Sequence, residues 1–550
     1  MIPARHRLCV RLLLLCLTWP CLYRVLGADT SRSQPPNIVL LLADDLGYSD
    51  LDCYGGEIPT PNLDRLAAGG LRFTQFYNTA RCWPSRAAIL TGYYAQEVRR
   101  DIVPGATSGG AGTRPSWAQL LPARLRERGY RSYHSGKWHL DGRPLDNGFD
   151  HSYSLDDHDR HFAPQLHRED DKPLPAVTPG SGYYTTTAIA THAIRSLEAH
   201  AREHAEAPFF SYIAFTAPHF PLQAPAEDIQ RQRQKYDAGW EVVHEARWRR
   251  QQQLGIGGSR LAPFEREVGP PYPFPEALQR LGSAEVNRPV PWSTLTSSQQ
   301  RFQSDKMAVH AAMVDRMDRE IGRILNQLQA MGAWTNTLIL FLSDNGASAE
   351  IMVRGDGHNP DAQCGTGATF LSLGPGWSTV ANTPFRRHKT WVHEGGISTP
   401  FIAHWPAGIR ARNTWRHGPS HVIDIAPTCL ELAGIEVGSV ATSPDAPKLP
   451  GRSLRPLFQR DLRDRERTLW WWHEENRALR VGDWKIVAAG KNAPWELYNL
   501  RRDRSETQDL AGRDSGRVAR MAADWQRMTD QIVAHATQDL AKPTPVAPGR

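Results

Sequence analysis

The chain has 550 residues, of which 40% are hydrophobic and 22% are charged, as in an ordinary soluble globular protein. This length allows a large core that divides into two domains. The formal net charge of +7 is modest for this size and suits an anionic substrate. No clustered basic stripe with stacking aromatic residues is present, so we expect no nucleic-acid partner.

The N-terminal segment has the pattern of a secretion signal. A basic start (Arg5, His6, Arg7, Arg11) leads into a largely apolar run at 10–22, and Gly27 and Ala28 precede a polar linker. The run is too short and too interrupted for a membrane span, and no later stretch approaches twenty apolar residues. We predict a signal peptide over residues 1–28, a secreted or periplasmic protein and no stable membrane association. A retained N-terminal anchor is the alternative.

Four cysteines follow the predicted signal: Cys53, Cys82, Cys364 and Cys429. They show neither a disulfide framework nor the Cys/His spacing of a zinc site.

Short, continuously apolar runs at 37–43, 209–215 and 337–342 each end in polar residues. Such runs are typical of strands that are buried on both faces of a parallel sheet. Helical patterns lie between them at 184–197, 226–254 and 306–331, and a further helix is expected at 422–433. Strands that alternate with helices predict an α/β fold, with a large mostly parallel or mixed sheet sandwiched by helices.

The character of the chain changes after residue 450. Short aromatic, strand-like pieces at 469–472, 479–487 and 495–500 precede an amphipathic helix at 515–534. We predict a main domain over residues 36–454, a smaller C-terminal α+β domain over 455–540 and a Pro-rich tail over 541–550. Long loops are expected at 105–115, 140–182, 255–291 and 347–384, where loops of this length are usually functional or disordered.

Carboxylate and amide side chains follow two of the predicted strands: Asp44 and Asp45 follow the first, and Asp344 and Asn345 follow the third. Ligands of open parallel sheets bind at the carboxyl ends of the strands, so these side chains should converge. Oxygen donors without Cys or His select Ca²⁺ or Mg²⁺ over zinc, and a flexible anionic set favours Ca²⁺. Helix capping is the alternative explanation for the first pair alone.

A cysteine stands just before a proline that can open a helix, in the segment Cys82-Trp83-Pro84-Ser85-Arg86, and Leu90-Thr91-Gly92 follows. The start of a helix gathers anions, and the planar cation of Arg86 suits an oxyanion. Further polar segments are Gly136-Lys137-Trp138-His139-Leu140, Ala217-Pro218-His219-Phe220-Pro221 and the stretch from Thr383 to Lys389 with Glu394-Gly395-Gly396.

In this order, these segments resemble the formylglycine-dependent (type I) sulfatases of the alkaline phosphatase superfamily, and bacterial arylsulfatases most of all. The resemblance covers about residues 36–500. It implies hydrolysis of aryl or carbohydrate sulfate monoesters to an alcohol or phenol and inorganic sulfate. It also implies that a formylglycine-generating enzyme oxidises Cys82 to 3-oxoalanine (formylglycine), whose hydrate attacks the sulfur and forms a sulfo-enzyme intermediate.

The resemblance also assigns the site. Asp44, Asp45, modified Cys82, Asp344 and Asn345 are implied as ligands of Ca²⁺, with Mg²⁺ as the alternative. Arg86 and Lys137 complete the cage, and Asp45 or Asp344 assists attack. Lys389 and His219 hold the sulfate, His219 protonates the leaving oxygen, and His139 takes the proton that lets the hemiacetal collapse. Proton transfers of this kind contribute roughly 10²–10⁴-fold each.

The sequence leaves three questions open. A phosphodiesterase or phosphonate monoester hydrolase of the same superfamily is one alternative, and a catalytically inactive glycan-binding homologue is another. The substrate can be a sulfated small molecule or a sulfated glycan. Trp83 fills a position that is more often small in the motif and could narrow the entrance, and His134, His388 and His393, near the active-site segments, are assigned no role.

Overall fold

The computed structural model describes residues 34–258, 260–354, 357–436, 446–463 and 466–540. The predicted signal peptide and the predicted tail lie outside these residues. Among the described residues, no helix combines the length and apolar character needed to cross a bilayer.

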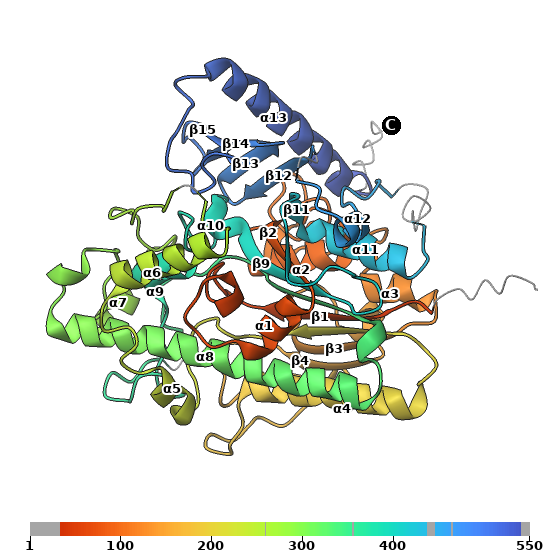
Figure 1. Ribbon diagram of the computed structural model, residues 1–550. Helices are drawn as coiled ribbons and strands as arrows, with labels where there is room; N and C mark the ends of the chain where they lie inside the picture. The colour runs from red at the N-terminus through yellow and green to blue at the C-terminus, as the bar shows by residue number, and fades with distance from the viewer. Residues whose placement is uncertain (1–33, 259, 355–356, 437–445, 464–465, 541–550) are drawn as a thin grey trace, which may run out of the picture. The chain divides into compact units, whose positions relative to one another are not determined.

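A large mixed sheet of eleven strands is the centre of the described part of the chain (Figure 1). Its order is β10-β2-β9-β8-β1-β7-β3-β4-β5-β6, and β11 pairs with β2. The central run from β8 to β4 is parallel throughout, whereas β9 is antiparallel to both of its neighbours. The strands are β1 (Asn37–Ala43), β2 (Leu71–Tyr77), β3 (Arg131–Lys137), β4 (His151–Leu155), β5 (His167–Glu169), β6 (Lys172–Pro173), β7 (Phe209–Ala214), β8 (Thr337–Ser343), β9 (Ser398–His404), β10 (Thr414–Arg416) and β11 (Ser420–His421).

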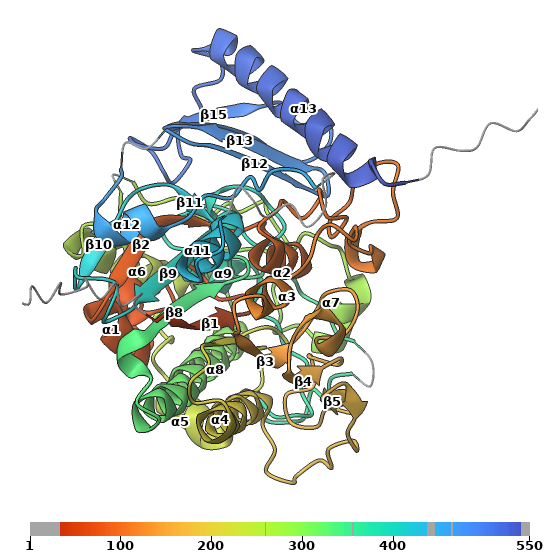
Figure 2. The ribbon, with the colours of Figure 1, turned by 90° about the vertical axis from the view of Figure 1, so that its right-hand side faces the viewer.

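Helices cover both faces of this sheet, because alternate residues of the central strands are apolar on both sides. Val39 and Leu41 of β1 belong to one hydrophobic cluster, and Ile38 and Leu40 belong to another. In Figures 1 and 2, α4 and α8 lie along one face, and α2, α3 and α11 lie on the other. These helices are α2 (Cys82–Thr91), α3 (Leu121–Arg126), α4 (Thr185–Glu203), α8 (Ser297–Ala330) and α11 (Ile425–Leu432). Helix α1 (Pro61–Ala68) packs against α8 and β9.

The longest of these helices, α8, begins well before the predicted start at residue 306. Thr296 accepts a hydrogen bond from the backbone N–H of Gln299, and the Gln299 side chain bonds back to Thr296, which forms a capping box. This reciprocal cap satisfies two backbone groups that would otherwise lack partners, so the polar residues that follow remain helical.

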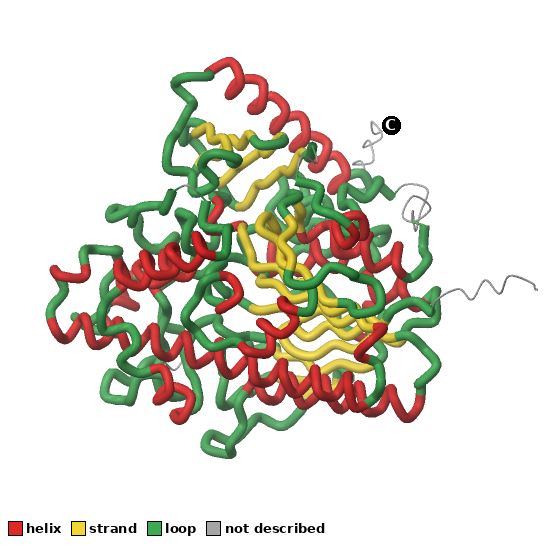
Figure 3. Tube along the Cα trace, viewed as in Figure 1, coloured by secondary structure: helices red, strands yellow, loops and turns green. Residues whose placement is uncertain are grey.

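A second, antiparallel sheet of the order β12-β13-β14-β15 follows, with α13 packed across it (Figure 3). Its elements are β12 (Thr468–His473), β13 (Asn476–Val481), β14 (Trp484–Ala488), β15 (Glu496–Asn499) and α13 (Ser515–Thr537). The single strand predicted at 479–487 is in fact two strands, because the chain reverses at Gly482, whose φ of +58° is easily adopted by glycine. The predicted α/β fold class, with its smaller C-terminal sheet, is confirmed.

Other differences from the prediction lie in the long connections. The helix predicted at 226–254 is two helices, since the backbone becomes extended at Arg233 (ψ 148°). The loops predicted at 140–182, 255–291 and 347–384 contain strands β4 to β6 and helices α7 and α9 respectively. The remaining helices are α5 (Ala226–Gln232), α6 (Trp240–Gln253), α7 (Pro275–Leu281), α9 (Gly374–Ala381), α10 (Glu394–Ile397) and α12 (Arg455–Gln459).

Candidate active site

Four polar side chains meet where β1 and β8 end side by side. Asp44 and Asp45 directly follow β1, Asp344 and Asn345 directly follow β8, and all four are almost fully buried. The amide of Asn345 donates to Asp45 Oδ1 over 2.6 Å. Parallel neighbours place their carboxyl ends at the same edge of a sheet, which explains why residues about 300 positions apart converge.

Each carboxylate of this cluster has a cationic partner. Lys137 Nζ lies 2.6 Å from Asp44 Oδ2, and Lys389 Nζ lies 2.9 Å from Asp45 Oδ2. Arg86 places Nη2 2.7 Å from Asp344 Oδ2, and its Nη1 donates to the backbone oxygen of Lys137 over 2.8 Å. Three cations therefore surround three buried carboxylates.

These partners split the pKa values of two neighbouring carboxyl groups. Burial alone would raise the pKa of Asp44, but Lys137, His219 and Arg86 together hold it well below the usual range. Burial raises the pKa of Asp344 to about 7, and the negative charge of Asp44 adds to this rise, which Arg86 and Lys137 only partly oppose. Asp44 is therefore the carboxylate that is most strongly held in its charged form.

The cluster also fits a divalent cation. Asp44 Oδ1 and Asn345 Oδ1 are buried and have no hydrogen-bond partner within the described residues. Potential ligand atoms of Asp44, Asp45 and His219 all lie within 4.8 Å of one another. Unsatisfied buried oxygens are costly unless an ion or water binds them, and such hard donors suit Ca²⁺ or Mg²⁺. His219, which the sequence places among the catalytic groups, thus also lies at the metal end of the site.

Cys82 is the first residue of α2 and is 3% exposed. Burial raises the pKa of its thiol, a rise that Lys137 and Lys389 oppose and that Asp44 and Asp344 reinforce. The thiol therefore lies among the charged groups of the cluster.

Other residues of the same motif shape the helix. Ser85 Oγ accepts from the backbone N–H of Thr79 over 3.1 Å, and Gly92 ends α2 in a left-handed conformation with φ +82°. The motif therefore combines groups that face the cluster with groups that fix the turn and the helix carrying them.

Three histidine rings follow one another beside the cluster. The ring centroid of His158 lies 5.3 Å from that of His139 and 5.6 Å from that of His219. Burial, with the nearby charge of Lys137, lowers the pKa of all three rings well below the usual range. His219 Nδ1 lies 2.5 Å from the backbone oxygen of Phe220, which leaves Nε2 facing Asp45 at 3.7 Å.

The backbone of His139 has a φ of +57°, which is uncommon for a residue other than glycine and orients its side chain after β3.

Sequence reasoning missed two members of this site. His158 comes from the long loop between β4 and β5, in which no spacing pattern identifies a partner. Glu350 follows β8 and joins two cations, with one oxygen 3.1 Å from Lys389 Nζ and the other 3.2 Å from Arg81 Nη1. Although burial opposes it, these cations hold the pKa of Glu350 below its usual range. The only sequence signal was a carboxylate close after the Asp344-Asn345 pair.

Trp83 lies beside His139, as its position in the motif suggests. Its ring is 5.7 Å from His139 and 6.1 Å from His473, and the guanidinium of Arg81 lies 5.1 Å from it. His473 belongs to β12, so the C-terminal sheet contributes one of the rings beside Trp83.

The three unassigned histidines each have a polar partner. His134 contacts Ser152 Oγ at 3.1 Å, His388 contacts Ser378 Oγ at 3.0 Å, and His393 contacts Glu496 at 3.4 Å.

Comparison with known proteins identifies the family of this site. The Sulfatase family model matches residues 36–435, which is most of the chain. The chain belongs to the sulfatase family. A second model, for the C-terminal part of N-sulphoglucosamine sulphohydrolase, matches residues 386–533. The resemblance read from the sequence motifs is thereby confirmed.

Individual relatives agree with this assignment. An arylsulfatase of Klebsiella aerogenes is 33% identical over 475 residues, covering 80% of this chain and 96% of the relative. An uncharacterized sulfatase of Schizosaccharomyces pombe is 31% identical over 525 residues, covering 88% of this chain and 91% of the relative. The crystal structure of Ps i-CgsB in complex with k-i-k-neocarrahexaose shares the fold, with a TM-score of 0.63, 23% identity and coverage of 90% and 93% of the two chains.

Proposed function

We propose that this sulfatase, a sulfuric ester hydrolase, cleaves sulfate monoesters with a nucleophile made from Cys82. A maturation enzyme would oxidise the Cys82 thiol to formylglycine, whose hydrate supplies the attacking oxygen and later eliminates sulfate. The observation that carries the proposal is the place of Cys82 at the start of α2, among Lys137, Lys389, Asp44 and Asp344. The family match and the named relatives support sulfate ester hydrolysis better than they support phosphonate hydrolysis or glycan binding without catalysis.

We assign the divalent cation to the oxygens of Asp44, Asp45, Asp344 and Asn345, together with modified Cys82. The donors are hard oxygens on three carboxylates and one amide, a set that favours Ca²⁺, with Mg²⁺ as the alternative. When bound, the ion supplies positive charge beside the reacting oxygens and lowers the pKa of a bound hydroxyl.

The basic side chains would bind and orient the ester. Lys389 and Lys137 present ammonium groups beside Cys82, and Arg86 keeps Asp344 and the end of β3 in place through its two hydrogen-bonded contacts. In a buried site these fixed charges stabilise the negative charge that develops on sulfate oxygens, with no cost of reorganisation at the moment of reaction.

Two histidines would move protons. His219 holds its Nδ1 hydrogen on the Phe220 carbonyl, so Nε2 is the atom that can carry a proton to the leaving oxygen. His139 is neutral, and its buried Nδ1 has no hydrogen-bond partner among the described residues, which suits a base.

The wider assignments belong to the same proposal. The substrate is an aryl or carbohydrate sulfate, since the relatives' names include both classes. The protein is made with a signal peptide over residues 1–28, acts outside the cytoplasm, meets a formylglycine-generating enzyme during maturation, and has neither a nucleic-acid partner nor a stable membrane association. A catalytic domain over residues 36–454 and a smaller domain over 455–540 form its working parts.

The test compares substrates and metals on enzyme purified from a host that has the maturation enzyme. We expect turnover of 4-nitrophenyl sulfate well above that of bis(4-nitrophenyl) phosphate, loss of turnover on chelation, and recovery with Ca²⁺. Faster turnover of the phosphate diester would contradict the sulfatase assignment. Full activity after rigorous metal removal would reject the ligand assignment, and binding of Ca²⁺ measured by calorimetry should disappear in Asp44→Asn.

A further inference from the structure

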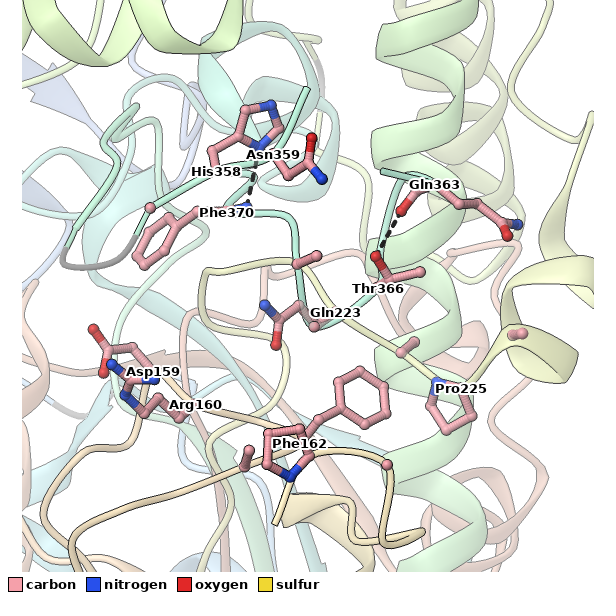
Figure 4. Close-up of a pocket in the computed structure, with 18 of the residues that line it drawn as sticks. Asp159, Arg160, Phe162, Gln223, Pro225, His358, Asn359, Gln363, Thr366 and Phe370 are labelled. Atoms are coloured by element: carbon pink, nitrogen blue, oxygen red, sulfur yellow. Dashed lines mark hydrogen bonds between the residues drawn. The ribbon is translucent and has the colours of Figure 1, made fainter. Parts of the chain in front are cut away.

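A large cavity lies beside the catalytic groups and has no role in the chemistry described so far. Its volume is about 770 Å³, and it is bordered by the loop between β4 and β5, by the start of α5 and by the loop after β8. In the view of Figure 4, Phe370 and Phe162 lie on either side of Gln223, and Asp159 and Arg160 border the same space. The lining therefore combines aromatic rings with charged and amide groups.

This cavity shares its wall with His219, the residue that the proposed mechanism assigns to protonation of the leaving oxygen. The ring of Phe220 lies 4.1 Å from that of His219, and Arg354, a lining residue, places its guanidinium carbon 5.4 Å from the Phe220 ring. The ring of Phe370 is 6.4 Å from that of Phe220. Phe220 thus stands between His219 and the cavity.

A second connection runs through the loop that carries His158. Asp159 follows His158 directly and lines the cavity, and His161 Nε2 lies 3.3 Å from the backbone oxygen of His219. Because the proposed mechanism has His219 protonate the oxygen that leaves with the alcohol, the alcohol would extend towards this side. The cavity is therefore placed to receive the part of the substrate beyond the ester.

The size and lining of the cavity exceed what a simple phenol requires. Pockets of roughly 300–1,000 Å³ bury whole ligands of drug size, whereas a phenyl ring would fill little of this space. Aromatic side chains pack against the apolar faces of sugar rings, and carboxylate, amide and guanidinium groups bond to ring hydroxyls. Phe162 and Phe370, with Asp159 and Gln223 beside them, offer both kinds of contact.

Arg354 adds a preference for negative charge. Its side chain is 46% exposed, and its ion pair with Asp159, itself 22% exposed, spans 3.6 Å. A long, solvated pair of this kind contributes little, so a ligand can replace it at low cost. The guanidinium has the planar fork that binds sulfate or carboxylate through two hydrogen bonds.

We propose that this cavity binds the sugar chain of a sulfated oligosaccharide, with Phe162 against a sugar ring and Arg354 on a second acidic substituent, either sulfate or carboxylate. The inference rests on the proposed sulfatase function and names its substrate class. Phe162 and Arg354 would set specificity and take no part in the cleavage itself.

The experiment first ranks ligands on the wild-type enzyme. A panel of heparin, chondroitin sulfate and carrageenan oligosaccharides is tested as competitors of 4-nitrophenyl sulfate and as substrates. We expect at least one oligosaccharide with two acidic groups to bind more tightly than the aryl ester, by about tenfold or more if Arg354 forms a charge-assisted pair with it. If every oligosaccharide binds no better than 4-nitrophenyl sulfate while that ester is hydrolysed, the inference is wrong and the sulfatase function stands. If no sulfate ester of either class is hydrolysed, the proposed function fails instead.

Variants then test the two residues on the preferred oligosaccharide. Arg354→Gln should weaken binding of this oligosaccharide about tenfold, and Arg354→Lys should restore part of the loss. Binding of a congener without the second acidic group should be unaffected by either change. Phe162→Leu keeps apolar volume but removes the flat ring, so it should weaken both oligosaccharides. None of these changes should alter kcat/KM for 4-nitrophenyl sulfate by more than about twofold, since a phenyl ring fills little of the cavity.

Arg249→Gln is the matched control, because Arg249 is also exposed and paired with a single carboxylate, Glu245, on α6. Equal losses on the aryl ester and the oligosaccharides, or no loss on either, would overturn the assignment. Whether the second acidic group is a sulfate or a carboxylate is resolved by comparing N- or O-sulfated members of the panel with members that contain uronic acid.

Discussion

Lys485 offers a direct test of what holds the C-terminal sheet to the rest of the protein. The side chain is fully buried on β14, with Nζ 3.0 Å from Glu394 and 2.8 Å from Glu506. Lys485→Met keeps most of the side-chain volume but leaves two buried carboxylates without this cation. Removing one partner of a buried ion pair typically costs about 3–5 kcal/mol, because the remaining charge is uncompensated. We expect a loss of this size in the free energy of unfolding.

Urea unfolding at pH 7, followed by tryptophan fluorescence, measures the loss. Arg501→Met is the matched control: its ion pair with Asp483 is short, at 2.6 Å, but the two side chains are 47% and 35% exposed. Exposed pairs contribute about 0–1 kcal/mol, so the control should be nearly neutral. If Lys485→Met costs no more than the control, the argument from burial is refuted.

The same substitution has a predictable pH dependence. Burial would raise the pKa of Glu394, but Lys485, Arg504 and Arg480 bring it down to about 2, below the value of 4.5 for an ordinary glutamate. A depressed pKa contributes stability above pH 4.5, and this contribution is lost as the pH falls towards 2. The cost of Lys485→Met should therefore be largest at neutral pH and shrink in acid, and a cost that is independent of pH would contradict the charge argument.

Three further results are expected. Asp318 accepts from the backbone N–H groups of Asn62 and Leu63 at the start of α1, so Asp318→Ala should lower the free energy of unfolding by about 1–2 kcal/mol in a denaturant titration, and an unchanged midpoint would reject the cap. Glu350→Gln should reduce kcat/KM for an aryl sulfate by about 10–100-fold, because it loosens Lys389, which we propose binds the sulfate; wild-type kinetics would show that Glu350 is dispensable. Trp83→Ala should reduce kcat by about 10–100-fold through loss of packing on His139, whereas Trp83→Phe should retain most activity, and equal kinetics of the two variants would contradict a positioning role.

Much of the central sheet is predictable because its strands are apolar on both faces. The runs at β1, β7 and β8 contain almost nothing else, and their polar endings point to the edge where the site forms. By contrast, β3 has the sequence RSYHSGK and is nonetheless almost wholly buried, because neighbouring strands and helices enclose it. Its polar residues find partners from distant elements, as His134 does with Ser152, and no local pattern reveals such pairing.

The candidate site divides in the same way. Cys82, Arg86, the Asp44-Asp45 pair and the Asp344-Asn345 pair stand in short motifs that can be recognised in the sequence. His158 and Glu350 lie in long connections, and only the folded backbone brings them to His219 and Lys389. The conformation of such long loops depends on contacts with residues that are distant in the sequence. For the same reason, the cavity beside His219 has no signature in the sequence.

Mass spectrometry of the peptide that contains residue 82 tests the central claim most directly. The enzyme is expressed with and without the maturation enzyme, digested, and assayed in parallel for hydrolysis of a sulfate ester. We predict that the thiol of Cys82 is replaced by an aldehyde in active preparations, and that activity rises in proportion to the converted fraction. A fully active enzyme whose residue 82 is still an unmodified thiol would contradict the account.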